Sequence, residues 1–255
     1  MKRFTAIFIV LILSASLLAA CSSSKDSGKL VIGIDDKFAP MGFRDDKNEI
    51  VGFDIDYAKA AAEKMGVEAE FLPIDWSAKE SELNSGRIDL IWNGYTITEE
   101  RKGKVLFTKP YLENSQVIVT KKDSPIRSMS DLTGKTIGLQ SLSSAADAVN
   151  GSPLKDQVKQ ITEYKDNVLA LSDLRIGRIE AVVIDEIVIK YYMSKEKDAF
   201  SLLDESVAPE EYGIGVKKGN EELLNKLQKA LDELNADGTA AKISRTWFGE
   251  DKVLK

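Results

Sequence analysis

Arg101 lies where a helix is expected to begin, which is an unusual place for a cation. In the segment GRIDLIWNGYTITEERKGK, an apolar strand over Ile88–Trp92 ends in a polar turn, and Thr98 then has the side chain of a helix N-cap residue. Arg101 falls in the first helical turn, where the helix dipole favours anions. We therefore expect Arg101 either to bind an anion or to be a surface arginine balanced by Glu99 and Glu100.

Asp185 and a pair of serines are further candidates for contact with a charged group. Asp185 ends the apolar strand Ala181–Ile184, where a buried carboxylate needs a partner. Its alternative role is the N-cap of a helix that starts at Glu186. Ser143 and Ser144 lie just before a predicted helix, whose free N–H groups favour an anion.

The elements that must position these residues follow an α/β pattern. Short apolar strands alternate with helices from Leu30 onward, which predicts a largely parallel sheet. The expected strands are Leu30–Ile34, Val67–Leu72 and Ile88–Trp92. The expected helices are one capped by Asp54 and ended by Gly66, one over Ser77–Ser85, one capped by Asn220 and stopped by Gly238, and a shorter one from Thr239 that packs through Ile243 and Trp247.

Two lobes are suggested by a short internal similarity. The segment Gly86–Leu90 (GRIDL) reappears as Gly177–Ala181 (GRIEA), although any helix-to-strand turn favours such a glycine. The extended stretches Asn114–Thr120 and Glu211–Val216 would join the lobes. We therefore expect a discontinuous first lobe, residues 29–113 plus 213–255, and a continuous second lobe, residues 114–212.

The N-terminus has the features of a secretory signal over residues 1–20. Lys2 and Arg3 precede an apolar run that ends in Leu18-Ala19-Ala20-Cys21, which resembles the bacterial lipoprotein signal. Cys21 would then carry lipid, and residues 21–28 would form a tether, although an inert cysteine near an ordinary cleavage site is the alternative. No later segment is long and apolar enough to span a bilayer, so we expect an extracytoplasmic, lipid-anchored protein.

Composition excludes several classes of function. The 35 Lys and Arg against 41 Asp and Glu give a net charge of −6, which makes nucleic acid an unsuitable partner. With no histidine and a single cysteine, the chain has no Ser-His, Cys-His or zinc-histidine chemistry. Any catalysis would depend on Asp, Glu, Lys or Tyr, and we expect no cofactor and no metal.

Six stretches together resemble the family 3 solute-binding proteins of polar amino acid ABC transporters. They are IGIDDKFAPMGF, GFDIDYAKAAAEKMG, GRIDLIWNGYTITEERKGKVLFTKPY, LTGKTIGLQSLSSA, GRIEAVVIDEIV and ADGTAAKISRTWFG, in the family's order. The resemblance implies a bilobed type II periplasmic-binding-protein fold, two α/β lobes joined by two hinge strands, with the ligand between them. Such a position agrees with ligand binding beyond the carboxyl ends of strands.

The resemblance also assigns roles to the polar candidates. Arg101 would hold the α-carboxylate of an amino acid, because its planar guanidinium can pair both oxygens. Ser143 and Ser144 would hold that carboxylate from the other lobe, and Asp185 would receive the α-ammonium group. The further contacts that the resemblance implies with the ligand are made by Gly94, Tyr95, Thr96 and Gln140.

The pocket for the ligand side chain is implied by the same resemblance. Phe38 and Trp76 would form its flat walls, although core packing is the usual role of such aromatic residues. Asp35 would accept a side-chain donor, which argues against an acidic ligand, or would only cap the next turn. Asn93 and Leu142 depart from the residues common in the family, so Asn93 is expected to add a polar contact and Leu142 to alter its loop.

The function implied is that of an extracytoplasmic receptor that captures a basic, amide or cystine-like amino acid and delivers it to an ABC permease with a cytoplasmic ATPase. A monomer is sufficient for this task. Two alternatives share the fold: an enzyme similar to cyclohexadienyl dehydratase, which would need a general acid in the cleft, and a ligand sensor.

Overall fold

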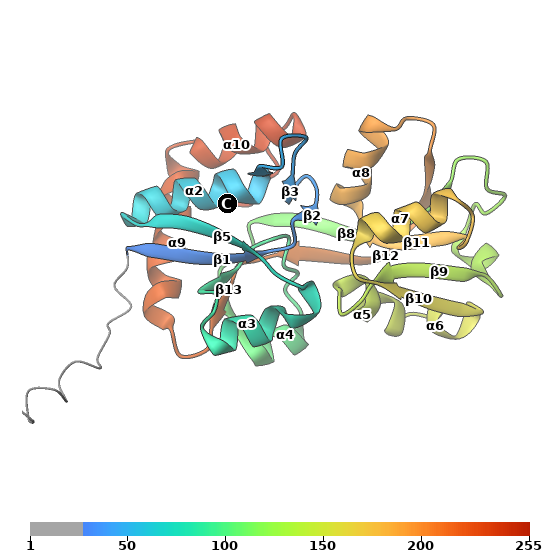
Figure 1. Cartoon of the computed structure of the whole chain (residues 1–255), viewed down its shortest axis with the longest axis horizontal. Coiled ribbons are helices and arrows are strands. Elements are labelled where there is room, and N and C mark those ends of the chain that lie inside the picture. Colours follow the sequence, from blue (N-terminus) through green and yellow to red (C-terminus); the bar gives the residue numbers. More distant parts are fainter. Residues whose placement is uncertain (1–27) are drawn as a thin grey trace, which may run out of the picture.

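The computed structural model describes residues 28–255, in which two sheets lie side by side (Figure 1). The expected signal peptide, the lipidation of Cys21 and all of the tether except Gly28 lie outside the described residues. Within residues 28–255, no helix has both the length and the apolar character needed to cross a membrane.

The first lobe is built on a five-stranded sheet in the order β5-β1-β6-β13-β7. Parallel pairing joins β1 (Lys29–Ile34) to β5 (Glu68–Pro73) and to β6 (Leu90–Ile91), whereas β13 (Gly215–Lys217) runs antiparallel to β6 and to β7 (Val105–Phe107). The helices α2 (Phe53–Met65), α9 (Glu221–Ala236) and α10 (Thr239–Phe248) pack together, and α3 (Lys79–Ser85) and α4 (Glu99–Lys104) lie across the sheet from α2 (Figure 1). A small antiparallel sheet is added by β2 (Lys37–Phe38), β3 (Gly42–Arg44) and β4 (Ile50–Val51).

The second lobe contains the sheet β10-β9-β11-β8-β12. Its strands are β8 (Leu112–Lys121), β9 (Thr136–Gln140), β10 (Gln160–Tyr164), β11 (Ala181–Asp185) and β12 (Phe200–Tyr212). Its helices are α5 (Ser144–Asn150), α6 (Leu154–Gln157), α7 (Asn167–Arg175) and α8 (Glu186–Lys195). The antiparallel pair β8 and β12 extends between the two lobes (Figure 1), which confirms the α/β bilobed fold with two connecting strands.

The beginning of α2 differs from the prediction. Gly52, and not Asp54, occupies the N-cap position, with a positive φ of 143° and with Met41 so close that a Cβ atom would lie 2.1 Å from its carbonyl oxygen. Only glycine fits that turn. The side chain of Asp54 is therefore free to point into the protein, where it reaches a different partner.

Three other predicted elements are shorter or shifted. The segment expected as one helix over Ser77–Ser85 is a 3-10 turn over Trp76–Ala78 followed by α3, because the side chain of Asp75 caps the turn by accepting from Ser77 N. The strand expected over Ile88–Trp92 contains only Leu90–Ile91, and that expected over Val67–Leu72 is Glu68–Pro73.

The C-terminal helices follow the sequence pattern closely. Asn220 caps α9 by accepting a 3.2 Å hydrogen bond from Leu223 N, and Leu227, Leu231 and Leu234 are buried. In α10, Ile243 and Trp247 are half-buried against the core. Of the two expected connections, Asn114–Thr120 lies within β8, whereas Glu211–Val216 is divided between β12 and β13. The exact lobe boundaries, 113/114 and 212/213, remain a prediction.

Candidate functional site

Arg101 is buried at the first turn of α4, with 4% of its surface exposed. Thr98 is the N-cap residue, and its Oγ1 accepts a 3.1 Å hydrogen bond from Arg101 N. The guanidinium lies over the ring of Tyr95, with Cζ 4.7 Å from the ring centroid, and donates a 3.0 Å hydrogen bond to the carbonyl oxygen of Thr96. These contacts fix the guanidinium and leave most of its donors unused.

The alternative of a balanced surface arginine is wrong. Glu99 pairs with Lys102 at 2.7 Å and Glu100 pairs with Lys104 at 2.6 Å, both on the exposed side of the helix. Arg101 forms no ion pair with any carboxylate of residues 28–255. A buried cation without an anion is costly, so this position suits an external anion.

Asp185 ends β11 as a buried carboxylate. Its Oδ1 accepts a 2.8 Å hydrogen bond from Asn114 Nδ2 and a short one from the Tyr212 hydroxyl. The side chain makes no capping hydrogen bond to α8, so the N-cap alternative is wrong for the side chain, although the residue occupies that position. Burial, and then the nearby charge of Glu210, raises the pKa of Asp185 to about 7.

A polar network joins the Arg101 end of the cleft to the Asp185 end. Thr96 Oγ1 lies 3.0 Å from Ser144 Oγ, which brings the two lobes into contact. Gln116 Nε2 donates to Ser144 Oγ at 3.3 Å and to Glu210 Oε2 at 3.0 Å. Ser144 is the first residue of α5, and Ser143 is its N-cap, with Oγ accepting from Ala146 N. The structure therefore places Thr96, Arg101, Ser144 and Asp185 along one continuous set of contacts.

Asp35 and Gln140 meet at another part of the cleft. Asp35 Oδ2 accepts a 2.8 Å hydrogen bond from Gln140 Nε2, and Oδ1 accepts a 3.0 Å bond from Lys37 N. Asp35 therefore caps its turn with one oxygen and crosses to the second lobe with the other. Burial raises the pKa of Asp35 to about 6, against the opposing effect of the hydrogen bond from Gln140.

The three aromatic candidates are buried in the first lobe. Phe38 lies against Gly94, since a Cβ atom on that glycine would be 2.7 Å from Phe38 Cε1. Trp76 and Tyr95 meet edge to face at 5.9 Å. Tyr95 also stacks on Phe107 and donates to Glu80 Oε1 at 2.9 Å, so it supports Arg101 from beneath.

Asn93 and Leu142 lie at the two departures from the family pattern. Asn93 Nδ2 lies 3.4 Å from the carbonyl oxygen of Asp35, and its Oδ1 faces Gly42, where an added Cβ would be 2.1 Å away. Asn93 thus contacts its own lobe. Leu142 has a positive φ of 51° and is exposed, which explains why glycine would suit that loop.

Three buried charged residues, Asp54, Lys79 and Asp166, were not selected as site residues by sequence reasoning. Asp54 accepts a 2.7 Å hydrogen bond from Gly94 N and a 3.0 Å bond from the Tyr111 hydroxyl, so it fixes the turn that contains Gly94. Lys79 Nζ donates to the carbonyl oxygen of Leu142 in the second lobe at 2.9 Å. Burial, and then the charge of Arg101, lowers the pKa of Lys79 to about 8. An acidic residue near a helix start and a lysine in a polar helix gave no signal of burial.

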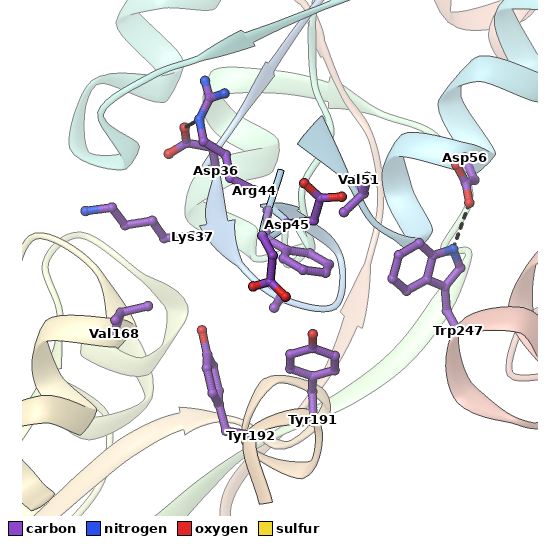
Figure 2. A pocket seen from close by; sticks show the side chains of 13 residues that line it. Asp36, Lys37, Arg44, Asp45, Val51, Asp56, Val168, Tyr191, Tyr192 and Trp247 are labelled. Carbon is purple, nitrogen blue, oxygen red and sulfur yellow. Dashed lines mark hydrogen bonds and ion pairs between the residues drawn. The ribbon is translucent and has the colours of Figure 1, made fainter. Parts of the chain in front are cut away.

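The surface cavities differ in their relation to these residues. A cavity of about 240 Å³ opens beside Asp35 and Trp76, and its rim includes Asp166. A larger groove of about 770 Å³ contains none of the twelve predicted contacts. Figure 2 shows this groove, with Tyr191 and Tyr192 on one side and Asp45 on the other. The chemistry therefore points to the zone where the two lobes meet and not to this groove.

Comparison with known proteins adds to this geometry. The model of the bacterial extracellular solute-binding proteins, family 3, matches residues 30–250, which is most of the chain. The chain belongs to that family. This membership confirms the resemblance found in the six sequence stretches.

Individual relatives are named for the ligands that they bind. The arginine-binding extracellular protein ArtP of Bacillus subtilis (strain 168) is 33% identical over 99% of this chain and 100% of its own length. The L-cystine-binding protein TcyJ of Escherichia coli (strain K12) is 32% identical over 89% of this chain and 85% of its own. A structure of an ABC uptake transporter substrate-binding protein from Streptococcus pneumoniae, with bound histidine, is 40% identical and has a TM-score of 0.86, covering 89% of this chain and 95% of that one.

Proposed function

We propose that this protein captures a free polar amino acid, of the basic, amide or cystine-like class, between its two lobes and delivers it to an ABC importer. One observation carries the proposal: buried Arg101 has no anionic partner among residues 28–255, and buried Asp185 has no cationic one. Opposite charges at two ends of one network suit a zwitterion. Membership of family 3 supports the same function.

Binding would use the side chains in complementary ways. Arg101 would pair the α-carboxylate in a bidentate manner, with Ser143, Ser144 and the N-terminus of α5 facing it from the second lobe. Asp185 would accept from the α-ammonium group, and Thr96 and Gly94 would contact the ligand backbone. Asp35, with Phe38 and Trp76, would receive the ligand side chain.

The transport step would depend on lobe closure. The lobes already meet through the contacts of Thr96 with Ser144 and of Asp35 with Gln140. A ligand that touches both lobes would add contacts present only in this arrangement, and would shift the population towards it. The permease would then recognise the closed form, and a monomer would be sufficient.

The proposal also includes a lipid anchor on the protein and binding of the amino acid without a chemical reaction. A lipid on Cys21 would hold the protein outside the cell membrane, beside its permease and away from nucleic acid. The relatives compared above are named as binding proteins, and one of them is the substrate-binding protein of an ABC uptake transporter, which supports capture without a reaction. The positive charge of Arg101 and the carboxylate of Asp185, at opposite ends of the network, suit an amino acid, which has both an anionic and a cationic group, better than a cyclic acid.

Thermal unfolding in the presence of candidate ligands tests the proposal. The mature domain, freed of ligand by unfolding and refolding, is heated with each standard amino acid, ornithine and cystine. A ligand at 100 times its dissociation constant adds about 2.7 kcal/mol and visibly raises the melting temperature. We expect a rise with arginine, lysine, histidine, glutamine or cystine. No rise with any amino acid would overturn the proposal.

A further inference from the structure

Glu210 lies half-buried on the connecting strand β12, where the two lobes meet through Thr96 and Ser144, and sequence reasoning did not select it. Its Oε2 accepts three hydrogen bonds, from Thr96 Oγ1 at 3.2 Å, Asn114 Nδ2 at 3.0 Å and Gln116 Nε2 at 3.0 Å. Thr96 belongs to the first lobe, and the two amides belong to β8. One carboxylate oxygen thus joins the ligand-facing turn of one lobe to a strand that connects both.

Glu210 is also coupled to Asp185. Asn114 Nδ2 donates to Oδ1 of Asp185 at 2.8 Å and to Oε2 of Glu210 at 3.0 Å, so a single neutral amide nitrogen bridges the two carboxylates. Neither carboxylate forms an ion pair with a lysine or arginine of residues 28–255. Two negative charges that share one donor repel each other, and a cation placed between them would remove that repulsion.

The charged groups around the pair do not supply such a cation. The Tyr212 hydroxyl contacts Asp185 from β12. Glu210 also lines a pocket of about 700 Å³, whose other charged residues are Glu113, Glu186, Glu211 and Lys252. Lys252 has its own partner, Glu250, at 2.7 Å. The surroundings therefore add more negative charge than positive.

We infer that Glu210 is a second carboxylate of the ammonium subsite, so that the α-ammonium of a bound amino acid lies between Asp185 and Glu210. The inference rests on the proposed function and extends it by one residue. Glu210 then contributes to the discrimination between an amino acid and the same molecule without its amino group. It also ties affinity to pH, because burial and the charge of Glu210 raise the pKa of Asp185 to about 7 and an ammonium ion binds the ionised form.

Calorimetric titration of the refolded mature domain tests this role. The probes are L-arginine and L-glutamine, with their des-amino counterparts 5-guanidinopentanoate and glutaramate, each measured between pH 5.5 and 8. The variant is Glu210→Gln, which keeps the size of the side chain and removes its charge. The matched control is Glu211→Gln, the exposed neighbour on the opposite face of β12.

We expect Glu210→Gln to bind the amino acids roughly ten- to hundredfold more weakly at pH 8, as expected for the loss of a charged hydrogen bond, and to bind the des-amino counterparts as the wild type does. The loss of affinity on acidification should begin at lower pH in this variant, because Asp185 no longer has a charged neighbour. Glu210→Asp should retain the preference for an amino group. Glu211→Gln should behave as the wild type.

Four results would overturn the inference. Equal weakening for amino acids and des-amino counterparts would show that Glu210 acts only on the fold. Unchanged affinity would show that it does not face the ligand, and tighter binding would show that its own carboxylate occupies the site. A wild type that binds neither amino acid probe would also overturn the inference. The proposed function would fail as well only if no amino acid raised the melting temperature in the thermal unfolding experiment.

Discussion

Gln140 Nε2 lies 2.8 Å from Asp35 Oδ2, so the carboxyl ends of strands β9 and β1, in different lobes, meet through one hydrogen bond. The bond exists only when the lobes are together. It also presents Asp35 at the cavity lined by Trp76 and Asp166. Because the Asp35 carboxylate takes part in both the lobe contact and the cavity, a ligand side chain that binds it can also affect lobe closure.

Asp35→Ala should change which amino acid is preferred. We expect the affinity for a basic ligand to fall roughly ten- to hundredfold, because a charged hydrogen bond is lost, while binding through the α-carboxylate persists. The measurement is calorimetry with arginine and glutamine. Asp36→Ala is the control, since Asp36 pairs with Arg44 on the surface. Equal affinities in the Asp35 variant and the wild type would exclude contact between Asp35 and the ligand side chain.

Lys79→Met should weaken closure. The ammonium donates across the cleft to the carbonyl oxygen of Leu142 and also to that of Trp76, at 2.9 and 3.2 Å. Loss of the first bond, which has a charged donor, costs about 1.5–3 kcal/mol in the closed form only, so ligand affinity should fall roughly ten- to hundredfold. Small-angle scattering with saturating ligand should report the same compact form. The exposed Lys102→Met is the control, and wild-type affinity in Lys79→Met would show that the contact does not stabilise closure.

Gly94→Ala should damage both stability and binding. Gly94 has a φ of +57°, and an added Cβ would lie 2.7 Å from Phe38 Cε1 and 3.2 Å from the Tyr212 ring. Strain and overpacking of this kind cost on the order of 1–3 kcal/mol. Gly103→Ala is the matched control, because a Cβ there meets nothing within 4 Å. A melting temperature equal to that of the control would contradict the packing described around Gly94.

The stability of the ligand-free domain should fall as the pH rises from about 4 to 7. Burial is the main cause that raises the pKa of Asp35 to about 6 and those of Asp54 and Asp185 to about 7. The same groups titrate near 4 in the unfolded chain, so the folded chain binds more protons within this window and loses its advantage as pH increases. The melting temperature should be lower at pH 7.5 than at pH 5 by on the order of 5 °C.

Asp54→Asn provides the check on that pH effect. The amide keeps a carbonyl oxygen for Gly94 N and removes one titrating group, so its melting temperature should depend less on pH. If the wild-type melting temperature rose with pH across the window, it would contradict the claim that burial raises the pKa values of these carboxyl groups.

Most of the fold could be predicted from the sequence because local signals agreed with tertiary structure. Thr98 and Asn220 are capping residues in the structure, as their side chains indicated. Gly66 and Gly86 end their helices with positive φ. The exceptions lie where tertiary contacts compete with local preference: Asp54 resembles a cap but is drawn inward by Gly94 N.

The candidate site was only partly accessible from the sequence. Arg101 and Asp185 could be selected because each follows a strong local signal, a helix start and a strand end. Glu210, Asn114 and Gln116 could not, because their meeting depends on the pairing register of β8 and β12, which the sequence alone does not define. The lobe contact made by Lys79 depends on closure in the same way.

The central claim is that Arg101 binds the α-carboxylate of an amino acid, and Arg101→Ala tests it most directly. The measurement is calorimetric titration of the refolded mature domain with the amino acid that raises its melting temperature most, and with the α-amide of that amino acid. The exposed Arg245→Ala is the control. We predict that the wild type and Arg245→Ala bind the acid and not the amide, whereas Arg101→Ala binds neither. Wild-type affinity in Arg101→Ala would contradict the account.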